Sequence, residues 1–174
     1  MTPPSEVPVS SELYARVVAW VFREAELLDG GHEREWLETM VSKDVVYQVP
    51  LRQTVERAHG TGFSDTTFHL NESYGSLMTR VRRNESGYAW AEDPPSRTRH
   101  FVTNIRLAKL DGDRLALKSN LLIYRTRRDQ TLPQLLSGER QDVLRLEDGD
   151  LKLVVRTILL DLTVLETHNL AIIF

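Results

Sequence analysis

The segment RTRHFVTNIRL, residues 97–107, carries the side chains of this sequence that are best suited to acid–base chemistry. His100 could accept a proton, because a histidine side chain changes charge near neutral pH. Together with Asn104, Tyr47 and Tyr124 it could line a small pocket of polar groups. A pocket of this kind would suit a free-standing isomerase or dehydratase that uses His100 as its base.

The same segment also carries arginines, which favour a different interpretation. Arg97 and Arg99 lie beside His100, and Arg125 ends the next predicted strand. Guanidinium groups suit protein interfaces, because they bind carboxylates through two hydrogen bonds and are weakly hydrated. Other arginines follow on the later strands, at Arg106, Arg127, Arg128, Arg140, Arg145 and Arg156. Solvated strand ends would account for some of these arginines, but their clustering on one sheet favours a surface for a partner protein.

Motifs for other chemistry are missing from the sequence. It contains no cysteine, which excludes disulfides, thiolate zinc sites, a cysteine nucleophile and a cysteine-bound iron–sulfur cluster on this chain. The five histidines form no HxH or HxxxH pair, and there is no GxSxG, GxGxxG or phosphate-loop motif. We therefore predict that this chain has no catalytic, cofactor-binding or metal-ligating residues.

Composition narrows the class of protein further. The 174 residues have a net charge of -3, with 41% hydrophobic and 27% charged residues, as in a soluble globular domain. There is no basic surface for nucleic acid, no apolar run long enough for a membrane span and no signal-peptide pattern near the N-terminus. These features predict a cytoplasmic protein that binds neither nucleic acid nor membrane.

Hydrophobic periodicity and turn signals place helices before strands. The sequence predicts a flexible N-terminal arm over residues 1–9 and one α+β domain over residues 10–174. Asp-Gly pairs at residues 111–112 and 148–149 predict hairpins. The expected elements are helices from Ser10 to Gly30, over 33–41 and after Asn71, strands over 45–51, 97–110, 114–127, 139–147 and 151–162, and a long loop over 52–70.

The last predicted strand is apolar on both faces. Under strict alternation, Leu151, Leu153, Val155 and Leu159 share one face, and Val154, Ile158, Leu160 and Leu162 share the other. An antiparallel sheet commonly has one wet face, so the second face would need a cover. The closing run NLAIIF would expose apolar side chains unless it is docked, either in the protein's own core or against another subunit.

Four segments together resemble a known family. AWAEDPPSRTRHFVTNIRL, REWLETMVSKDVVYQVPLRQT, YRTRRDQTLPQLLSGERQDVLRLEDGDLKLVVRTILLD and TVLETHNLAIIF resemble motifs of the beta, or small, subunits of aromatic-ring-hydroxylating dioxygenases, the Rieske non-haem iron oxygenases. The resemblance runs from about residue 11 to the end. It implies a cone-shaped α+β domain, with N-terminal helices packed on a strongly curled, mainly antiparallel sheet. This is the fold of nuclear-transport-factor-like, SnoaL-like and scytalone dehydratase-like domains.

The resemblance also implies a function and partners. Such a chain is a structural, non-catalytic beta subunit that forms a trimer and joins three catalytic alpha subunits in a heterohexamer. The alpha subunit holds a Rieske 2Fe-2S cluster and mononuclear Fe(II), and the complex uses O2 and electrons from NADH to convert an aromatic compound to a cis-dihydrodiol. On this basis we expect Arg97, Arg99 and His100 near a subunit interface, with Arg125 and Asn169 as secondary candidates. A free-standing isomerase, dehydratase or epoxide hydrolase of the same fold remains the main alternative, and a non-catalytic ligand-binding or self-associating domain is the third.

Overall fold

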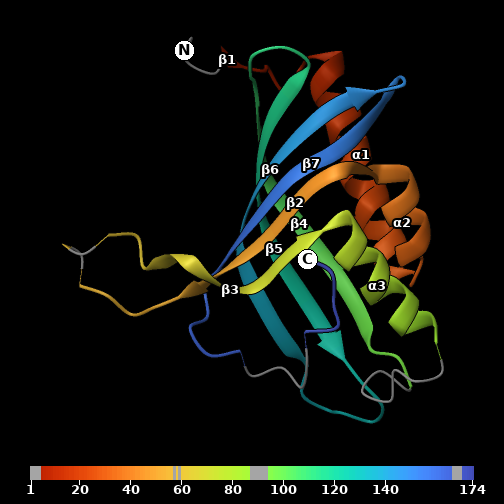
Figure 1. The fold of residues 1–174 in the computed structure, drawn as a ribbon, viewed down its shortest axis with the longest axis vertical. Coiled ribbons are helices and arrows are strands. Elements are labelled where there is room, and N and C mark those ends of the chain that lie inside the picture. The colour runs from red at the N-terminus through yellow and green to blue at the C-terminus, as the bar shows by residue number, and fades with distance from the viewer. Residues whose placement is uncertain (1–4, 57, 59, 87–93, 166–169) are drawn as a thin grey trace.

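The computed structural model describes residues 5–56, 58, 60–86, 94–165 and 170–174 and has an α+β architecture. Helices α1–α3 pack on one side of a strongly curled sheet whose strand order is β1-β4-β5-β6-β7-β2-β3 (Figure 1). All neighbouring strands are antiparallel except β2 and β7. The predicted fold class is confirmed. The elements are β1 Ser5–Glu6, α1 Glu12–Asp29, α2 Glu33–Met40, β2 Val41–Arg52, β3 Phe63–Ser73, α3 Tyr74–Glu85, β4 Arg97–Lys109, β5 Arg114–Thr126, β6 Gln134–Glu147 and β7 Asp150–Leu160.

Local signals explain where α1 begins and ends. The N-cap is Ser11, one residue after the predicted Ser10, and its hydroxyl accepts a hydrogen bond from the Tyr14 amide. Glu12 lies in the first turn, where a negative charge favours the helix dipole. The helix ends at Gly30, as predicted, and its buried stripe belongs to the same hydrophobic core as the inner residues of the sheet.

The predicted loop over residues 52–70 is wrong for its second half. Phe63–Ser73 forms β3, which pairs with β2 at the edge of the sheet. Most of its side chains are at least partly exposed, so the strand lacks the apolar alternation that identifies a half-buried strand. The next helix is therefore capped by Ser73, through a capping box with Ser76, and not by Asn71. The β2–β3 connection projects away from the body of the molecule (Figure 1).

The strands β4 to β7 form the predicted antiparallel meander. The Asp148-Gly149 turn has positive φ at both residues, 50° and 90°, and Gly112 in the other predicted turn has a φ of 71°. Positive φ at Asp-Gly positions is what a tight hairpin requires. Within the predicted N-terminal arm, Ser5–Glu6 pairs with the end of β4 as the two-residue strand β1.

A β-bulge in β7 overturns the predicted faces of this strand. Leu153 pairs with Leu144 and Val155 pairs with Val143, so Val154 is an extra residue. Side-chain alternation therefore shifts by one position at the bulge. The residues of β7 that are buried are Leu151 and Leu153 before it and Arg156, Ile158 and Leu160 after it. Four of the eight apolar side chains that strict alternation divides between two faces, Leu151, Leu153, Ile158 and Leu160, therefore share a single inner face, which continues across the bulge.

Candidate functional site

Two of the expected interface arginines lie on the outer face of β4. Arg97 donates from Nη2 to the Arg128 carbonyl over 2.8 Å and from Nε to Thr126 Oγ1 over 3.3 Å. Arg99 is 68% exposed and its Nη1 lies 3.7 Å from Asp29 Oδ2. Both guanidiniums are anchored at the surface of the protein, where a partner could reach them.

His100 points into the protein, and its side chain is only 2% exposed. Its Nδ1 lies 2.6 Å from Asp29 Oδ1 at the end of α1, and its Nε2 lies 2.9 Å from the carbonyl oxygen of Ile173. The His100 amide also donates to the Asp29 carboxylate. Both ring nitrogens are therefore used to join α1, β4 and the last residues of the chain.

The four residues of the possible acid–base pocket do not converge. Tyr47 is buried, and its hydroxyl contacts Phe174. Asn104 is exposed at a bulge in β4, with a φ of 52°, and Tyr124 lies on the outer face of β5. His100 and Tyr47 share one neighbour, because both bind backbone atoms of the terminal segment, residues 170–174.

Arg125, a secondary interface candidate, is not at the surface. Arg125 points inward, is 2% exposed and donates from Nε to Ser96 Oγ over 3.0 Å. Burial in the isolated chain leaves little of this side chain for a partner to contact. Asn169 lies outside the described residues.

Sequence reasoning missed a network of four buried charges in the core. Arg156 on β7 donates to both oxygens of Asp142 on β6, over 2.9 and 2.8 Å, and to Glu24 Oε2 on α1 over 2.9 Å. Arg140 on β6 donates from Nη1 to the same Glu24 oxygen over 3.0 Å. The assignment of Arg140 and Arg156 to a partner surface is therefore wrong, because both are internal.

The electrostatics of this network favour the charged forms of Glu24 and Arg156. Burial alone would raise the pKa of Glu24, but the guanidiniums of Arg156 and Arg140 outweigh burial and hold the pKa at about 2. Burial alone would lower the pKa of Arg156, but Asp142 and Glu24 hold it well above its usual range. Burial raises the pKa of Tyr47 to about 12, so its hydroxyl remains a hydrogen-bond donor.

The segment 170–174 closes the interior of the cone beside this network. Phe174 is fully buried, and its carbonyl oxygen accepts from Arg156 over 2.7 Å and from the Tyr47 hydroxyl over 3.2 Å. Side chains of α3 bind the start of the segment: Arg80 donates to the Leu170 carbonyl and Asn84 to the Ala171 carbonyl. The sequence left two places open for the apolar tail, the protein's own core or another subunit. In the structure, residues 171–174 are buried in the protein's own core.

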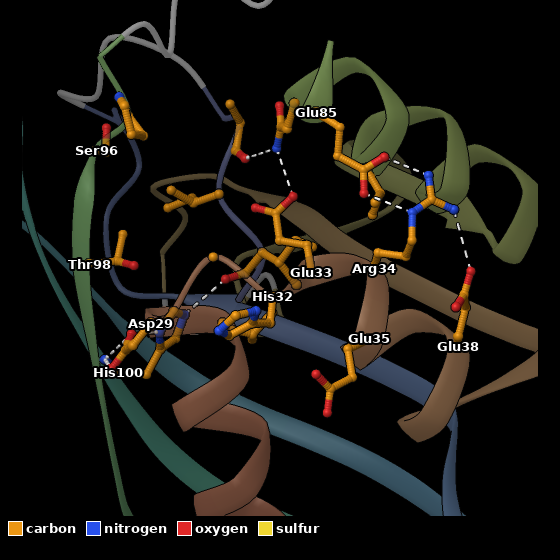
Figure 2. Close-up of a pocket in the computed structure, with 18 of the residues that line it drawn as sticks. Asp29, His32, Glu33, Arg34, Glu35, Glu38, Glu85, Ser96, Thr98 and His100 are labelled. Carbon is orange, nitrogen blue, oxygen red and sulfur yellow. Dashed lines mark hydrogen bonds and ion pairs between the residues drawn. The ribbon is translucent and has the colours of Figure 1, made fainter.

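A cavity of about 600 Å³ opens between α2, α3, β4 and the terminal segment (Figure 2). Many of its charged groups bind one another: Arg34 donates to Glu85 over 2.7 Å and contacts Glu38 over 3.3 Å, and Asn84 donates to Glu33 over 2.9 Å. Figure 2 shows Asp29 and His100 at one end of this cavity and the Arg34 cluster at the other. Within the described ranges, His, Asp and Glu form no group of three that could hold a metal ion.

The outer face of the sheet carries an apolar patch that the sequence analysis did not identify. Phe101 pairs with Leu122, and Tyr124 pairs with both Arg99 and Leu135, so these side chains adjoin across β4, β5 and β6. Phe101 is 53% exposed and Leu135 52%, and Leu122 and Tyr124 are also exposed. We call Phe101, Leu122, Tyr124 and Leu135 the outer patch. Large apolar side chains gathered beside an exposed arginine are typical of protein interfaces.

None of the helices in the described ranges of the chain is long and apolar enough to cross a membrane.

Comparisons with known proteins match this chain to one family and to structures of the same fold. A family model described as the ring-hydroxylating beta subunit matches residues 23–167. A structure of naphthalene 1,2-dioxygenase with indole bound in the active site is similar at 27% identity and a TM-score of 0.81, covering 93% of this chain and 86% of that chain. The beta subunit of benzoate 1,2-dioxygenase from Burkholderia mallei is 22% identical with a TM-score of 0.69, covering 84% and 89%. A protein from Novosphingobium aromaticivorans assigned to the scytalone dehydratases shares the fold, at 13% identity and a TM-score of 0.65, covering 90% and 89%.

Proposed function

Because this chain belongs to the ring-hydroxylating beta subunit family, we propose that it is the structural, non-catalytic beta subunit of a multicomponent aromatic-ring-hydroxylating dioxygenase. The observation that carries the proposal is the family match over residues 23–167, together with the similarity to naphthalene 1,2-dioxygenase over 93% of the chain. The complete enzyme would convert an aromatic hydrocarbon to a cis-dihydrodiol for catabolism in the cytoplasm. Its oxidant would be O2 and its electrons would come from NADH.

The proposed complex is a heterohexamer of three alpha and three beta subunits, built on a trimer of this chain. The outer patch and Arg99 support a contact surface on β4–β6, because both are exposed on the same face of the sheet. Apolar side chains at such a surface supply association energy, and exposed arginine supplies specific bonds to carboxylates. We propose this face as a subunit contact of the complex.

The proposed redox groups belong to the partner. A Rieske cluster is bound by two cysteines and two histidines, and this sequence contains no cysteine, so the chain does not have a complete ligand set. The alpha subunit would hold the Rieske 2Fe-2S cluster and the mononuclear Fe(II). This chain would contribute the platform on which the alpha subunits assemble.

The alternative, an isomerase or dehydratase with His100 as base, receives less support from the geometry. A general base must lie within hydrogen-bond reach of the proton that it removes. Here the Nε2 atom of His100 faces the Ile173 carbonyl and its Nδ1 atom faces Asp29. A substrate would have to displace the terminal segment to reach this ring.

Co-expression tests the proposal against this alternative. The chain would be produced alone and together with an alpha subunit that carries Rieske-type cysteine and histidine ligands, and the products compared by mass, iron content and turnover of an aromatic substrate. We expect an iron-free trimer from the chain alone and an iron-containing, active heterohexamer from the pair. A monomer that isomerises or dehydrates a substrate without a partner would contradict the proposal.

A further inference from the structure

Arg140 and Ser119 lie side by side on the inner face of the sheet. They are register partners on β6 and β5, so their side chains extend from the same face of the sheet. Arg140 is 1% exposed and Ser119 is fully buried. Among the described residues, neither the Nε and Nη2 atoms of Arg140 nor the Oγ atom of Ser119 has a hydrogen-bond partner.

One nitrogen of Arg140 is bonded, and this bond orients the guanidinium that carries the unpaired atoms. Its Nη1 atom donates to Glu24 over 3.0 Å. Its Nε atom lies 3.9 Å from Asp142 Oδ2, an ion-pair distance that is too long for a hydrogen bond. A buried donor without an acceptor costs as much as a lost hydrogen bond, and such groups in proteins are normally satisfied by an ordered water.

The charges around the site select the kind of ligand. The network pairs two acidic side chains, Glu24 and Asp142, with two basic ones, Arg140 and Arg156, so its formal charges balance. An anion would therefore add an unbalanced charge to a buried region, which is strongly unfavourable. The ligand must also accept from a guanidinium and exchange a hydrogen bond with a hydroxyl, and water does both.

We propose that a buried water-binding site lies between Arg140 and Ser119, where an ordered water accepts from Arg140 and bonds Ser119 Oγ. The same water lies within reach of Asp142 and links Arg140 to the carboxylate that it does not bond directly. The buried charge network would thus include an ordered water within the otherwise apolar core. This site is independent of the assembly described under Proposed function, because all of its groups are internal.

A crystal structure of the purified chain, or of its complex, tests the site directly. We expect an ordered water within hydrogen-bond distance of Arg140 Nε or Nη2 and of Ser119 Oγ. A crystal soaked in bromide separates water from an anion, because an anomalous peak at this position would mean that an anion is the ligand. Arg140 donors bonded to protein atoms, with no density between the two side chains, would also overturn the proposal.

A pair of variants gives a second test. Ser119→Val replaces the hydroxyl by methyl groups at a position that suits a β-branched side chain, and we expect the water density to disappear. Thr103→Val makes the equivalent change at an exposed position of β4 and should leave the water in place. If Ser119→Val does not fold, Ser119→Ala serves instead and should keep the water on Arg140. Equal water density in Ser119→Val and the unmodified chain would contradict the site.

Discussion

The Nη2 atom of Arg156 lies 2.9 Å from Oε2 of Glu24, and both side chains are buried. The two residues lie on β7 and α1, 132 positions apart in the chain. Because the same guanidinium also binds Asp142 on β6, one arginine joins the helical layer to two strands. Removing one member of such a network leaves an uncompensated buried charge, which costs more than the intact network contributes.

Glu24→Gln should therefore be strongly destabilising. We expect the free energy of unfolding to fall by about 3–5 kcal/mol, the usual cost of breaking a buried ion pair. Urea denaturation followed by circular dichroism measures this change. Glu26→Gln is the matched control, because Glu26 lies on the same helix in an exposed pair with Arg23 and should have almost no effect. Equal effects of the two variants would contradict the role of the buried network.

The protein should become less stable in acid, and protonation of Glu24 should account for part of this loss. The pKa of Glu24 is about 2 in the folded protein and has its ordinary value in the unfolded chain, so ionised Glu24 stabilises the fold above about pH 4.5. This stabilisation is lost as pH falls from about 4.5 towards 2. Unfolding free energies of the unmodified protein and Glu24→Gln, measured between pH 6 and pH 2.5, should converge as pH falls.

The comparison of these two proteins isolates Glu24 from the other carboxyls. Both retain the more exposed groups whose pKa is also lowered by neighbouring donors, Asp44, Glu85, Glu139 and Glu147. A stability difference that stays constant down to pH 2.5 would mean that Glu24 does not titrate in this range.

Phe174→Ala should destabilise the closed core. The ring is fully buried, so its removal leaves a cavity and should cost about 3–5 kcal/mol. Thermal unfolding should show a clear fall in Tm. Leu132→Ala removes a large apolar side chain that is 81% exposed and should leave Tm nearly unchanged. A Phe174→Ala protein as stable as the control would indicate that the terminal segment is not docked as described.

Gly138→Ala should destabilise the β6–β7 pairing. A Cβ atom at this position would lie 2.5 Å from the Leu159 carbonyl oxygen and 3.0 Å from Leu160 Cα, so the two strands would have to separate. We expect a loss of about 1–3 kcal/mol in urea denaturation. Gly75→Ala in α3, where the nearest atom is 3.9 Å away, should instead be neutral or stabilising.

Substitutions at two neighbouring residues of β4 should have different effects, one on assembly and the other on the stability of the fold. Arg99→Ala removes an exposed side chain and should weaken co-purification with the alpha subunit, while the isolated chain keeps its Tm. His100→Ala leaves Asp29 and the Ile173 carbonyl without their bonds to the ring and should cost about 2–3 kcal/mol of stability. Normal co-purification of Arg99→Ala would contradict its place in the proposed contact surface.

The sequence alone determined the features whose signals lie within a few residues of one another. The serine cap and glycine end of α1, the Asp-Gly turns and the order of helices before strands are local. The motifs that point to the beta subunit family are equally local, and the family match confirms that resemblance. His100 could be singled out by its type and by its position among arginines.

Only the tertiary structure decided what these residues contact. A single extra residue at Val154 changes which side chains of β7 face inward, and no local pattern marks such a bulge. His100 meets Asp29 and Ile173, which are 71 and 73 positions away, and Glu24 meets Arg140 across 116 positions. Strand register and the curl of the sheet set these long-range contacts. For this reason arginines of similar local context became surface groups at Arg97 and Arg99 and core groups at Arg140 and Arg156.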